Sequence, residues 1–579
     1  DNRINGSGSL QQRLAGRIDL DMPRLGQLWP RLQGQVKGRL DLAGTLQAPQ
    51  GTLSVQGQQL AQADNRVQRL DLDARLDSAQ RGQLTLKAGN IRLGETSLGD
   101  LNIAGKGDIR QQAVTLALAG PQLKLDLAAD GQLAKGDWRG RLASGRIQAG
   151  GQDWQLQAPA RLQRLANGQL DFGAHCWRSG QASLCGEDQR LAPEPRLRYH
   201  LKQFPIESLA QWMPKDFAWQ GQLNADINLD IPAAGPKGTI RVDASGGTLR
   251  VRDGQRWLDF PYQVLRLDST LNPRRIDTVL NFRGERLGEL ALTTRLDPLG
   301  KDKPLSGDFR LSGLDLAIAR PFLPMVERVA GQLNGSGRLS GSLLAPQVNG
   351  TLALTGGEVS GAQLPVSLQD LSVQALIAGE QVQLQGGWRS GTAGRAQLSG
   401  NLTWGQALAM QLRLQGQQLP VTVEPYATLE VAPDLTISLE GEQLAVKGKV
   451  LVPKGAITVR ELPPSTVKVS DDTVIIGNQT EQGTPPMAIA MDVNVEVGQD
   501  KLSFNGFGLT ANLRGHVHIG DNMDTRGELS LADGRYRAYG QRLTIRRARL
   551  LFAGPIDQPY LDIEAIRQVD DVIAGIRLS

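Results

Sequence analysis

The feature that most constrains this chain is a two-residue alternation of apolar and polar side chains, which recurs over most of its 579 residues. In "RLDLDARLD" (69–77), Leu or Ala alternates with Asp or Arg. The runs "KLDLA" (124–128), "ELALTTRL" (289–296) and "DVNVEV" (492–497) repeat the pattern. Strict alternation is typical of antiparallel strands with one apolar and one solvated face. The sequence therefore predicts an all-β chain.

The number of strands restricts how the sheet can be arranged. At about 11 residues per strand and turn, the chain would hold on the order of 50 strands, and one sheet of them would be roughly 200 Å long. Open sheets of more than about ten strands usually curl or split. Phe, Trp and Tyr make up only 4% of the chain, so ordinary cores built on large aromatic side chains are disfavoured. Two folds remain: separate β-sandwiches, or one long, mostly antiparallel sheet curled into an open trough with an aliphatic interior.

A repeated segment favours the single sheet. "GQVKGRLDLAGTLQAPQGTL" begins at Gly34, and similar segments begin at Gly221 and Gly331. A proline stands at the same offset in each copy, followed by Gly-Thr-Leu or Gly-Thr-Ile. The three copies are unequally spaced, which suits one growing sheet better than separate domains of even length.

A short amphipathic stretch precedes each copy, at 25–32, 205–217 and 316–329. Apolar residues at helical spacing predict short helices there, and a proline in each stretch would stop or kink the helix. The helices either cap the ends of the sheet or lie over its apolar face. For the second alternative, the side chains facing the groove would be Leu209, Trp212, Met213, Phe322, Leu323 and Val326.

The only two cysteines, Cys176 and Cys185, are symmetric about "SGQA" (179–182). Gly180 at the first central position predicts a type II′ hairpin, which places the cysteines opposite each other with Cα atoms about 4.5 Å apart. A zinc site would need about four ligands, and only His175 is near. We therefore expect a structural disulfide worth about 2–3 kcal/mol, and with it an oxidising compartment such as the bacterial periplasm. Phe172 and Trp177 are expected on opposite faces, so the face of Cys176 stays open.

Motifs for catalysis and cofactor binding are missing from the sequence. It has no G-x-x-x-x-G-K-[ST] loop and no G-x-S-x-G elbow. His516 and His518 share a strand face in "GHVHIG" but lack a third ligand pattern, so we expect no metal site. The net charge is only +5, and charged residues of both signs are interspersed along the chain, which argues against a nucleic-acid partner. The basic run "RLTIRRARL" (542–550) is either a solvated outer face or a contact for anionic groups. We expect no enzyme and no cofactor.

The two ends of the chain carry no targeting or membrane-spanning signal. The start has no signal-peptide pattern, and no run approaches the roughly 20 apolar residues that span a bilayer. The last residues, "DDVIAGIRLS", stop inside an alternating run. We therefore expect a fragment cut at both ends.

The C-terminal run "GELSLADGRYRAYGQRLTIRRARLLFAGPIDQPYLDIEAIRQVDDVIAGIRLS" resembles the end of the TamB family, a group of AsmA-like, bridge-type proteins. The resemblance implies a β-taco trough crossing the periplasm, an N-terminal inner-membrane anchor outside this chain, and docking of the extreme C-terminus on the outer-membrane barrel TamA. It also divides the chain into a repeating shaft with the hairpin disulfide (1–315) and a TamB-type C-terminal domain that continues the trough (316–579). The matching residues include Gly534, Tyr536, Tyr539, Gly540, Phe552, Gly554, Pro555, Pro559 and Arg567.

Three functions are compatible with these patterns. The first is a conduit that carries phospholipid between the inner and outer membranes, as the resemblance implies, with acyl chains in the trough. The second is a scaffold that assembles autotransporters and other outer-membrane β-proteins by strand addition. The third, a β-helical adhesin, is disfavoured by the uneven repeats. The residues expected to line the lipid groove are Leu84, Leu86, Leu123, Leu125, Leu127, Leu290, Leu292, Leu352, Leu354, Val493, Val495, Val497, Leu543 and Ile545.

Overall fold

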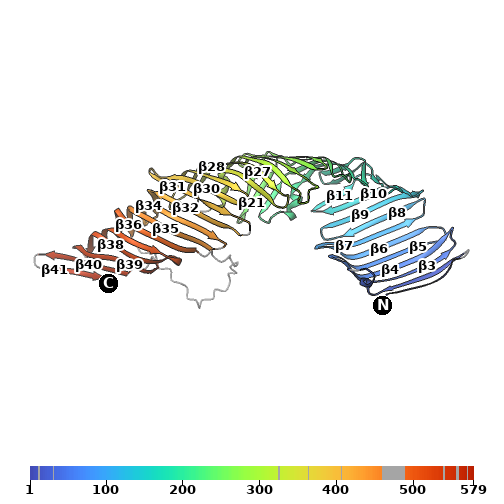
Figure 1. Ribbon diagram of the computed structural model, residues 1–579, viewed down its shortest axis with the longest axis horizontal. Coiled ribbons are helices and arrows are strands. Elements are labelled where there is room, and N and C mark those ends of the chain that lie inside the picture. Colours follow the sequence, from blue (N-terminus) through green and yellow to red (C-terminus); the bar gives the residue numbers. More distant parts are fainter. Residues whose placement is uncertain are drawn as a thin grey trace. The chain divides into compact units, whose positions relative to one another are not determined.

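The computed structural model confirms the all-β expectation. It describes residues 1–579 except 11–12, 30, 324–325, 363, 406, 442, 460–488, 507, 539–540, 556–559, 570–571 and 579. Over these described residues, 38 strands belong to one long, mostly antiparallel sheet, and three form a separate small sheet (Figure 1). The chain divides into two compact units. The first unit holds residues 1–284 and 293–303, and the second holds 285–292 and 304–579.

The first unit contains strands β1 to β24. Their bounds are β1 (Arg3–Leu10), β2 (Leu14–Met22), β3 (Leu32–Gly44), β4 (Pro49–Gln62), β5 (Asn65–Leu76), β6 (Gly82–Leu93), β7 (Thr96–Gly107), β8 (Gln112–Ala119), β9 (Leu123–Ala134), β10 (Asp137–Ala149), β11 (Gln152–Leu156), β12 (Ala160–Arg164), β13 (Leu170–Phe172), β14 (His175–Ser179), β15 (Ala182–Gly186), β16 (Gln189–Ala192), β17 (Arg196–Pro205), β18 (Phe217–Gln220), β19 (Gln222–Asp230), β20 (Lys237–Asp243), β21 (Thr248–Asp253), β22 (Arg256–Pro261), β23 (Val264–Asn272) and β24 (Arg275–Gly284). Strands β18, β21 and β22 form the small sheet.

The second unit contains strands β26 to β41, and β25 (Gly288–Leu296) is divided between the units. The bounds are β26 (Leu305–Asp315), β27 (Arg328–Gly341), β28 (Pro346–Ser360), β29 (Leu368–Ala378), β30 (Gln381–Ser390), β31 (Gly394–Thr403), β32 (Ala409–Gln417), β33 (Leu419–Val423), β34 (Ala427–Glu440), β35 (Gln443–Val459), β36 (Ile489–Gly506), β37 (Leu509–Ile519), β38 (Asp524–Ala538), β39 (Gln541–Pro555), β40 (Tyr560–Val569) and β41 (Val572–Leu578).

The helices are shorter and tighter than the sequence predicts. They are 3₁₀ helices: η1 (Leu25–Gln27), η2 (Ile206–Trp212), η3 (Leu316–Phe322) and η4 (Asp521–Met523). In η2 only Ile206 is fully buried, so the helix carries one anchoring side chain and not an apolar face. The nearby prolines explain this, because η2 stops two residues before Pro214 and η3 contains Pro321 near its end. Pro30 and Pro324 lie outside the described residues. None of the helices in the described part of the chain is long and apolar enough to cross a membrane.

The repeated segment is confirmed as a helix followed by a long hairpin. η1 precedes β3–β4 and η3 precedes β27–β28, while η2 precedes β19–β20 with β18 between them. The opening glycines Gly34, Gly221 and Gly331 have φ of +111°, +146° and +133°. The strand register shifts at Gly34 and at Gly331, so these two glycines are β-bulges that only a residue without Cβ fits easily.

The outer, polar face of the sheet carries ion pairs between neighbouring strands. The Arg17 Nε–Asp41 Oδ1 distance is 2.6 Å and the Arg39 Nε–Asp19 Oδ1 distance is 2.7 Å, both between residues that the register places opposite each other. Such exposed pairs add little stability, about 0–1 kcal/mol each. They do fix which face of the sheet meets water, because a one-residue slip would turn these charges inward.

The second unit has the best-formed core of the chain, near its C-terminal end. Val497, Leu502, Leu513 and Leu531 are at most 9% exposed and pack in one cluster. The buried members of the cluster come from β35 to β39, where β35 and β36 pair in parallel while the neighbouring strands pair in antiparallel fashion. A parallel pair cannot be joined by a tight hairpin turn, which is why a long connection separates these two strands.

Candidate functional site

The apolar side chains of β2–β9 form three continuous rows across the sheet, which define the inner face of the first unit. Residues opposite each other in antiparallel strands share a face, so the pairing register alone builds the rows. The first row is Ile18, Leu40, Leu53, Ala74, Leu84, Gly105 and Val114; the second is Leu20, Gly38, Val55, Leu72, Leu86, Ile103, Leu116 and Leu127; the third is Met22, Val36, Gly57, Leu70, Ala88, Leu101, Leu118 and Leu125.

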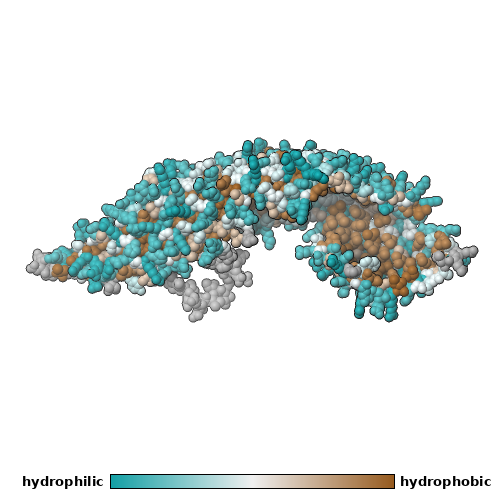
Figure 2. Space-filling view, viewed as in Figure 1, coloured by the Kyte–Doolittle hydropathy of each residue, from teal (hydrophilic) through white to brown (hydrophobic). Residues whose placement is uncertain are grey.

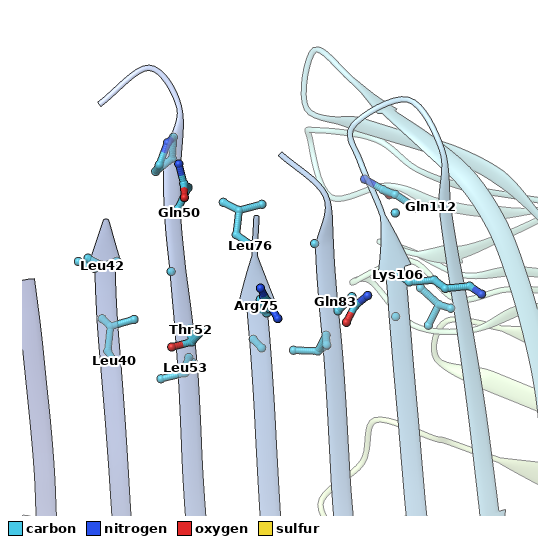
Figure 3. A pocket seen from close by; sticks show the side chains of 18 of the residues that line it. Leu40, Leu42, Gln50, Thr52, Leu53, Arg75, Leu76, Gln83, Lys106 and Gln112 are labelled. Atoms are coloured by element: carbon cyan, nitrogen blue, oxygen red, sulfur yellow. The ribbon is translucent and has the colours of Figure 1, made fainter. Parts of the chain in front are cut away.

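The inner face is most open to solvent along the first row and at Leu42 beside it, and we call its β3–β9 part the open groove. Leu42 is 38% exposed, Leu84 41% and Val114 38%, although all three are large and apolar. Figure 2 shows the open groove as a hollowed hydrophobic surface over these strands. One pocket in it has a volume of about 480 Å³, and Leu40, Leu42, Leu53 and Leu76 contribute to its lining (Figure 3). An exposed apolar surface of this extent is typical of a binding or interaction site.

The composition of the inner face changes at β10. Trp29 is the only Phe, Trp or Tyr among residues 1–137, so the open groove is aliphatic. Trp138 then lies across two glycines, since a Cβ placed on Gly131 or Gly140 would come within 2.6 Å of its ring. The aromatic segment, which we define as Trp138, Trp154, Trp177 and Phe204, therefore follows directly on the aliphatic groove.

Side chains of the aromatic segment meet across the inner face. Trp154 on β11 stacks on Phe204 of β17, with ring centroids 6.3 Å apart and planes 3° from parallel. β11 pairs with β14, β14 with β15, and β15 with β17, so three strand-to-strand steps separate β11 from β17. In a flat sheet the distance between these two strands would be about 14 Å. The sheet is therefore strongly curved here, and the aromatic side chains fill the space inside the curve.

The cysteine hairpin has the predicted register and cross-link. Cys176 pairs with Cys185, Ser179 with Ala182, and Gly180 has φ +56° while Gln181 does not, as a type II′ turn requires. The disulfide joins Cys176 and Cys185, whose Cα atoms are 4.0 Å apart. The next residue opposite Cys185 is His200, so the disulfide lies on the polar outer face.

One part of the hairpin prediction is wrong. Phe172 and Trp177 do not lie on opposite faces, because the strand is interrupted at 173–174 and the alternation restarts. Phe172 pairs with Leu162 and Trp177 with Leu156, and both partners belong to the inner face. The ring of Phe172 stacks on His175, with centroids 4.0 Å apart. Trp177 is 7% exposed and points inward, opposite to the disulfide.

Two histidines beside the hairpin have opposite electrostatic environments. Burial lowers the pKa of His175, partly offset by its Nδ1 donating a 2.8 Å hydrogen bond to the Gly173 carbonyl. On the outer face, the hydrogen bond to Asp226 raises the pKa of His200, with a 2.6 Å Nδ1–Oδ1 distance. The pKa of His175 is thus shifted toward the neutral form, and that of His200 toward the charged form.

The groove residues predicted in the first unit come together. Leu84, Leu86, Leu125 and Leu127 belong to the three inner-face rows, and Leu123 extends the same face of β9 opposite Ala149. Leu84 is exposed and the other four are half-buried. The aromatic segment was not predicted as a functional part; the scarcity of aromatic residues before Trp138 was the signal that could have located it.

The groove residues predicted in the second unit fall into two groups. Leu290, Leu292, Leu352 and Leu354 are half-buried on β25 and β28. The others lie in or against the core near the C-terminal end. Val493, Val497 and Leu543 are 5%, 9% and 9% exposed, and Val495 and Ile545 pack on the core cluster. Val493, Val497 and Leu543 are therefore buried, and Val495 and Ile545 are half-buried against the core cluster.

Three of the six predicted helix residues are exposed to solvent. Trp212 is 68% exposed, Phe322 43% and Leu323 41%, while Leu209, Met213 and Val326 are partly buried. Trp212 lies near the β10–β11 turn, since a Cβ on Gly150 would be 3.5 Å from its ring.

The residues that carry the family resemblance lie on β38–β40. Gly534 leaves room for Ile545, because a Cβ on Gly534 would be 2.6 Å from Ile545 Cδ1. Tyr536 packs on the core cluster. Tyr539, Gly540 and Pro559 lie outside the described residues. The remaining members are Phe552, Gly554 and Pro555 on β39 and Arg567 on β40.

Possible metal ligands are dispersed: within the described ranges, no three His, Cys, Asp or Glu side chains form a group that could hold a metal ion. His518 contacts Asn494 and Asp492 on the outer face. A long β-sheet with an open aliphatic inner face and a polar, ion-paired outer face defines a class of groove-bearing β-sheet proteins.

Comparison with known proteins places the chain within that class. Residues 1–354 match the family described as "TamB, N-terminal domain", and residues 385–579 match the "TamB C-terminal domain". The translocation and assembly module subunit TamB of Haemophilus influenzae is 24% identical over 618 residues, covering 100% of this chain and 47% of that protein. The chain belongs to the TamB family. It spans less than half the length (47%) of this curated relative.

Proposed function

We propose that this chain conducts phospholipid along its inner face, as part of a bridge through the periplasm between the inner and outer membranes. The observation that carries the proposal is the open groove of β3–β9, where Leu42, Leu84 and Val114 remain 38–41% exposed. Each buried methylene of an acyl chain contributes about 0.8 kcal/mol, so a chain of ordinary length would be held firmly. The aliphatic lining offers no deep polar site that would stop a chain from sliding.

Further features fit a lipid carrier in that compartment. The Cys176–Cys185 disulfide is stable in an oxidising space such as the periplasm. The Haemophilus influenzae relative is named as a subunit of a translocation and assembly module. We propose accordingly that the longer protein is anchored in the inner membrane and docks on an outer-membrane barrel of the TamA type.

Photo-crosslinking tests the proposal directly. A benzophenone amino acid is placed at Leu84 on the inner face, or at Lys87 on the outer face of the same strand, in the longer parent protein in living cells. Mass spectrometry then searches for phospholipid adducts. We expect adducts at Leu84 and none at Lys87. Equal labelling, or protein adducts alone at Leu84, would contradict the conduit.

A second candidate function is a scaffold for assembling outer-membrane β-proteins, and the name of the Haemophilus relative favours it. The two functions respond differently to a charge in the groove. Leu84→Asp should abolish lipid transfer and leave client assembly intact if the groove carries lipid, with Lys87→Asp as the matched outer-face control. Loss of assembly with normal lipid transfer would favour the scaffold.

A further inference from the structure

The apolar rows of the inner face continue beyond the aromatic segment. Trp177 pairs with Leu184, and the same row then runs through Leu201, Ala225 and Val242 to Leu267. On the other side of Trp177, the row leads back through Gly145 to Leu127 and the open groove. One continuous apolar path thus crosses the first unit, and a single indole side chain lies in it.

Trp177 is packed against the backbone on the far side of the path. A Cβ placed on Gly145 would lie 2.4 Å from Trp177 Cη2 and 2.8 Å from Cζ3, so the ring edge rests on the glycine itself. The same position is 3.2 Å from Leu127 Cδ2, which brings the end of the open groove up to the indole. Only 7% of the surface of Trp177 is exposed, so the indole is packed among protein atoms.

The hairpin holds this tryptophan in place from behind. Cys176 precedes Trp177, and its disulfide to Cys185 ties the two hairpin strands together on the outer face. The Trp154–Phe204 stack fills the same curved part of the sheet, because Trp154 and Leu156, the pairing partner of Trp177, share one face of β11. The backbone carrying the indole is therefore pinned, and passage requires movement of the side chain.

We propose that Trp177 is the residue that controls whether an acyl chain can pass from the open groove to the inner face of β17–β23. The inference rests on the proposed function, because it presumes lipid in the open groove. In the closed arrangement the indole fills the path. An acyl chain passes only when the ring leaves Gly145, so contacts that hold the ring slow the passage.

The test uses the purified chain and vesicles of phosphatidylethanolamine and phosphatidylglycerol. A benzophenone amino acid is placed either at Leu84, before Trp177, or at Leu267, beyond it. Lipid adducts are counted by mass spectrometry in wild type and in Trp177→Ala. We expect labelling at Leu84 in both proteins. Labelling at Leu267 should rise by roughly tenfold in Trp177→Ala, as when an obstacle of about 1.4 kcal/mol is removed.

Two further variants keep the test decisive. Gly145→Ala retains the tryptophan but places a methyl group where its ring rests, so it should also raise labelling at Leu267. Trp177→Phe should give an intermediate value. Trp257→Ala, which removes a partly exposed tryptophan on β22 of the small sheet, is the matched control and should change nothing. A non-reducing gel confirms that each variant still forms the Cys176–Cys185 disulfide.

The possible outcomes separate the inference from the proposed function. Equal labelling at Leu84 and Leu267 in wild type, or no increase in either Trp177→Ala or Gly145→Ala, would overturn the role of Trp177 while the conduit stands. Absence of adducts at Leu84 in every protein would remove the conduit itself. In wild type alone, labelling at Leu84 tests the conduit, and equal labelling at both positions would already overturn the role of Trp177.

Discussion

The disulfide between Cys176 and Cys185 closes a small loop, and its contribution to stability can be measured. Replacing both cysteines by serine should lower the free energy of unfolding of the first unit by about 2–3 kcal/mol, because the unfolded hairpin regains its freedom. Urea unfolding followed by tryptophan fluorescence measures this. Dithiothreitol should destabilise wild type by a similar amount and leave the double variant unchanged. Superimposable curves for all four samples would show that the cross-link contributes nothing.

His175 and His200 should give opposite pH dependences. In the unfolded chain a histidine has a pKa near 6.5, and burial lowers the pKa of His175 in the folded chain. The unfolded state therefore binds more protons, so His175 makes folding less favourable as the pH falls below about 6.5. The raised pKa of His200 gives a stabilisation that is present below about 6.5 and lost as the pH rises through the folded value.

Thermal unfolding near pH 5.5 and near pH 7.5 tests both histidines. Relative to wild type, His175→Phe should gain stability at the lower pH, and His200→Gln should lose it there. Identical pH profiles for the three proteins would show that neither group titrates differently on folding.

At the scale of the elements, the hairpin that opens the third repeat requires a positive φ at Gly331, a backbone conformation that is strained for any residue other than glycine. Gly331 has φ +133°, and a Cβ there would lie 3.0 Å from Gly357 Cα and 3.1 Å from Leu354 Cδ1. Gly331→Ala should therefore destabilise the second unit by about 1–3 kcal/mol. Gly554→Ala, at a glycine with no heavy atom within 4 Å, is the matched control. Chemical denaturation compares the two, and equal stability of both variants would disprove the bulge argument.

For the molecule as a whole, the inner face has two physical roles, and truncation of leucine distinguishes them. Leu502 is 2% exposed in the core cluster, so Leu502→Ala should cost about 2–5 kcal/mol. Leu84 is 41% exposed in the open groove, so Leu84→Ala should cost less than about 1 kcal/mol while reducing lipid labelling. Denaturant unfolding of both variants measures this. A large loss of stability in Leu84→Ala would mean that the open groove is a core.

Local patterns predicted those parts of the fold that depend on neighbouring residues. The alternation along each strand gave the all-β class, and the symmetry of "SGQA" gave the pairing of Cys176 with Cys185. The helix prediction failed in length and type because it counted apolar spacing and underweighted the prolines. The faces of Phe172 and Trp177 were assigned wrongly because the strand is interrupted at 173–174, and side-chain alternation does not continue across the interruption.

The candidate site shows the same division. Leu84, Leu86, Leu125 and Leu127 could be placed on one face from their own strands, since alternation alone selects them. Alternation does not distinguish Leu84, which faces solvent, from Val497, which is buried in the core cluster. That difference depends on how strongly the sheet curves, and curvature is a property of many strands together.

By itself, the sequence determined that the chain forms strands with one apolar and one charged face, where the hairpins turn, and that the two cysteines pair. These features depend on interactions between residues close in sequence or directly opposite in a hairpin. Only the tertiary structure decided that the inner face is open along β3–β9, filled by Trp177 and its aromatic neighbours at β10–β17, and closed into a core around β35–β39. The physical reason is that exposure of an apolar face depends on contacts across several strands, such as the Trp154–Phe204 stack, which no local pattern contains.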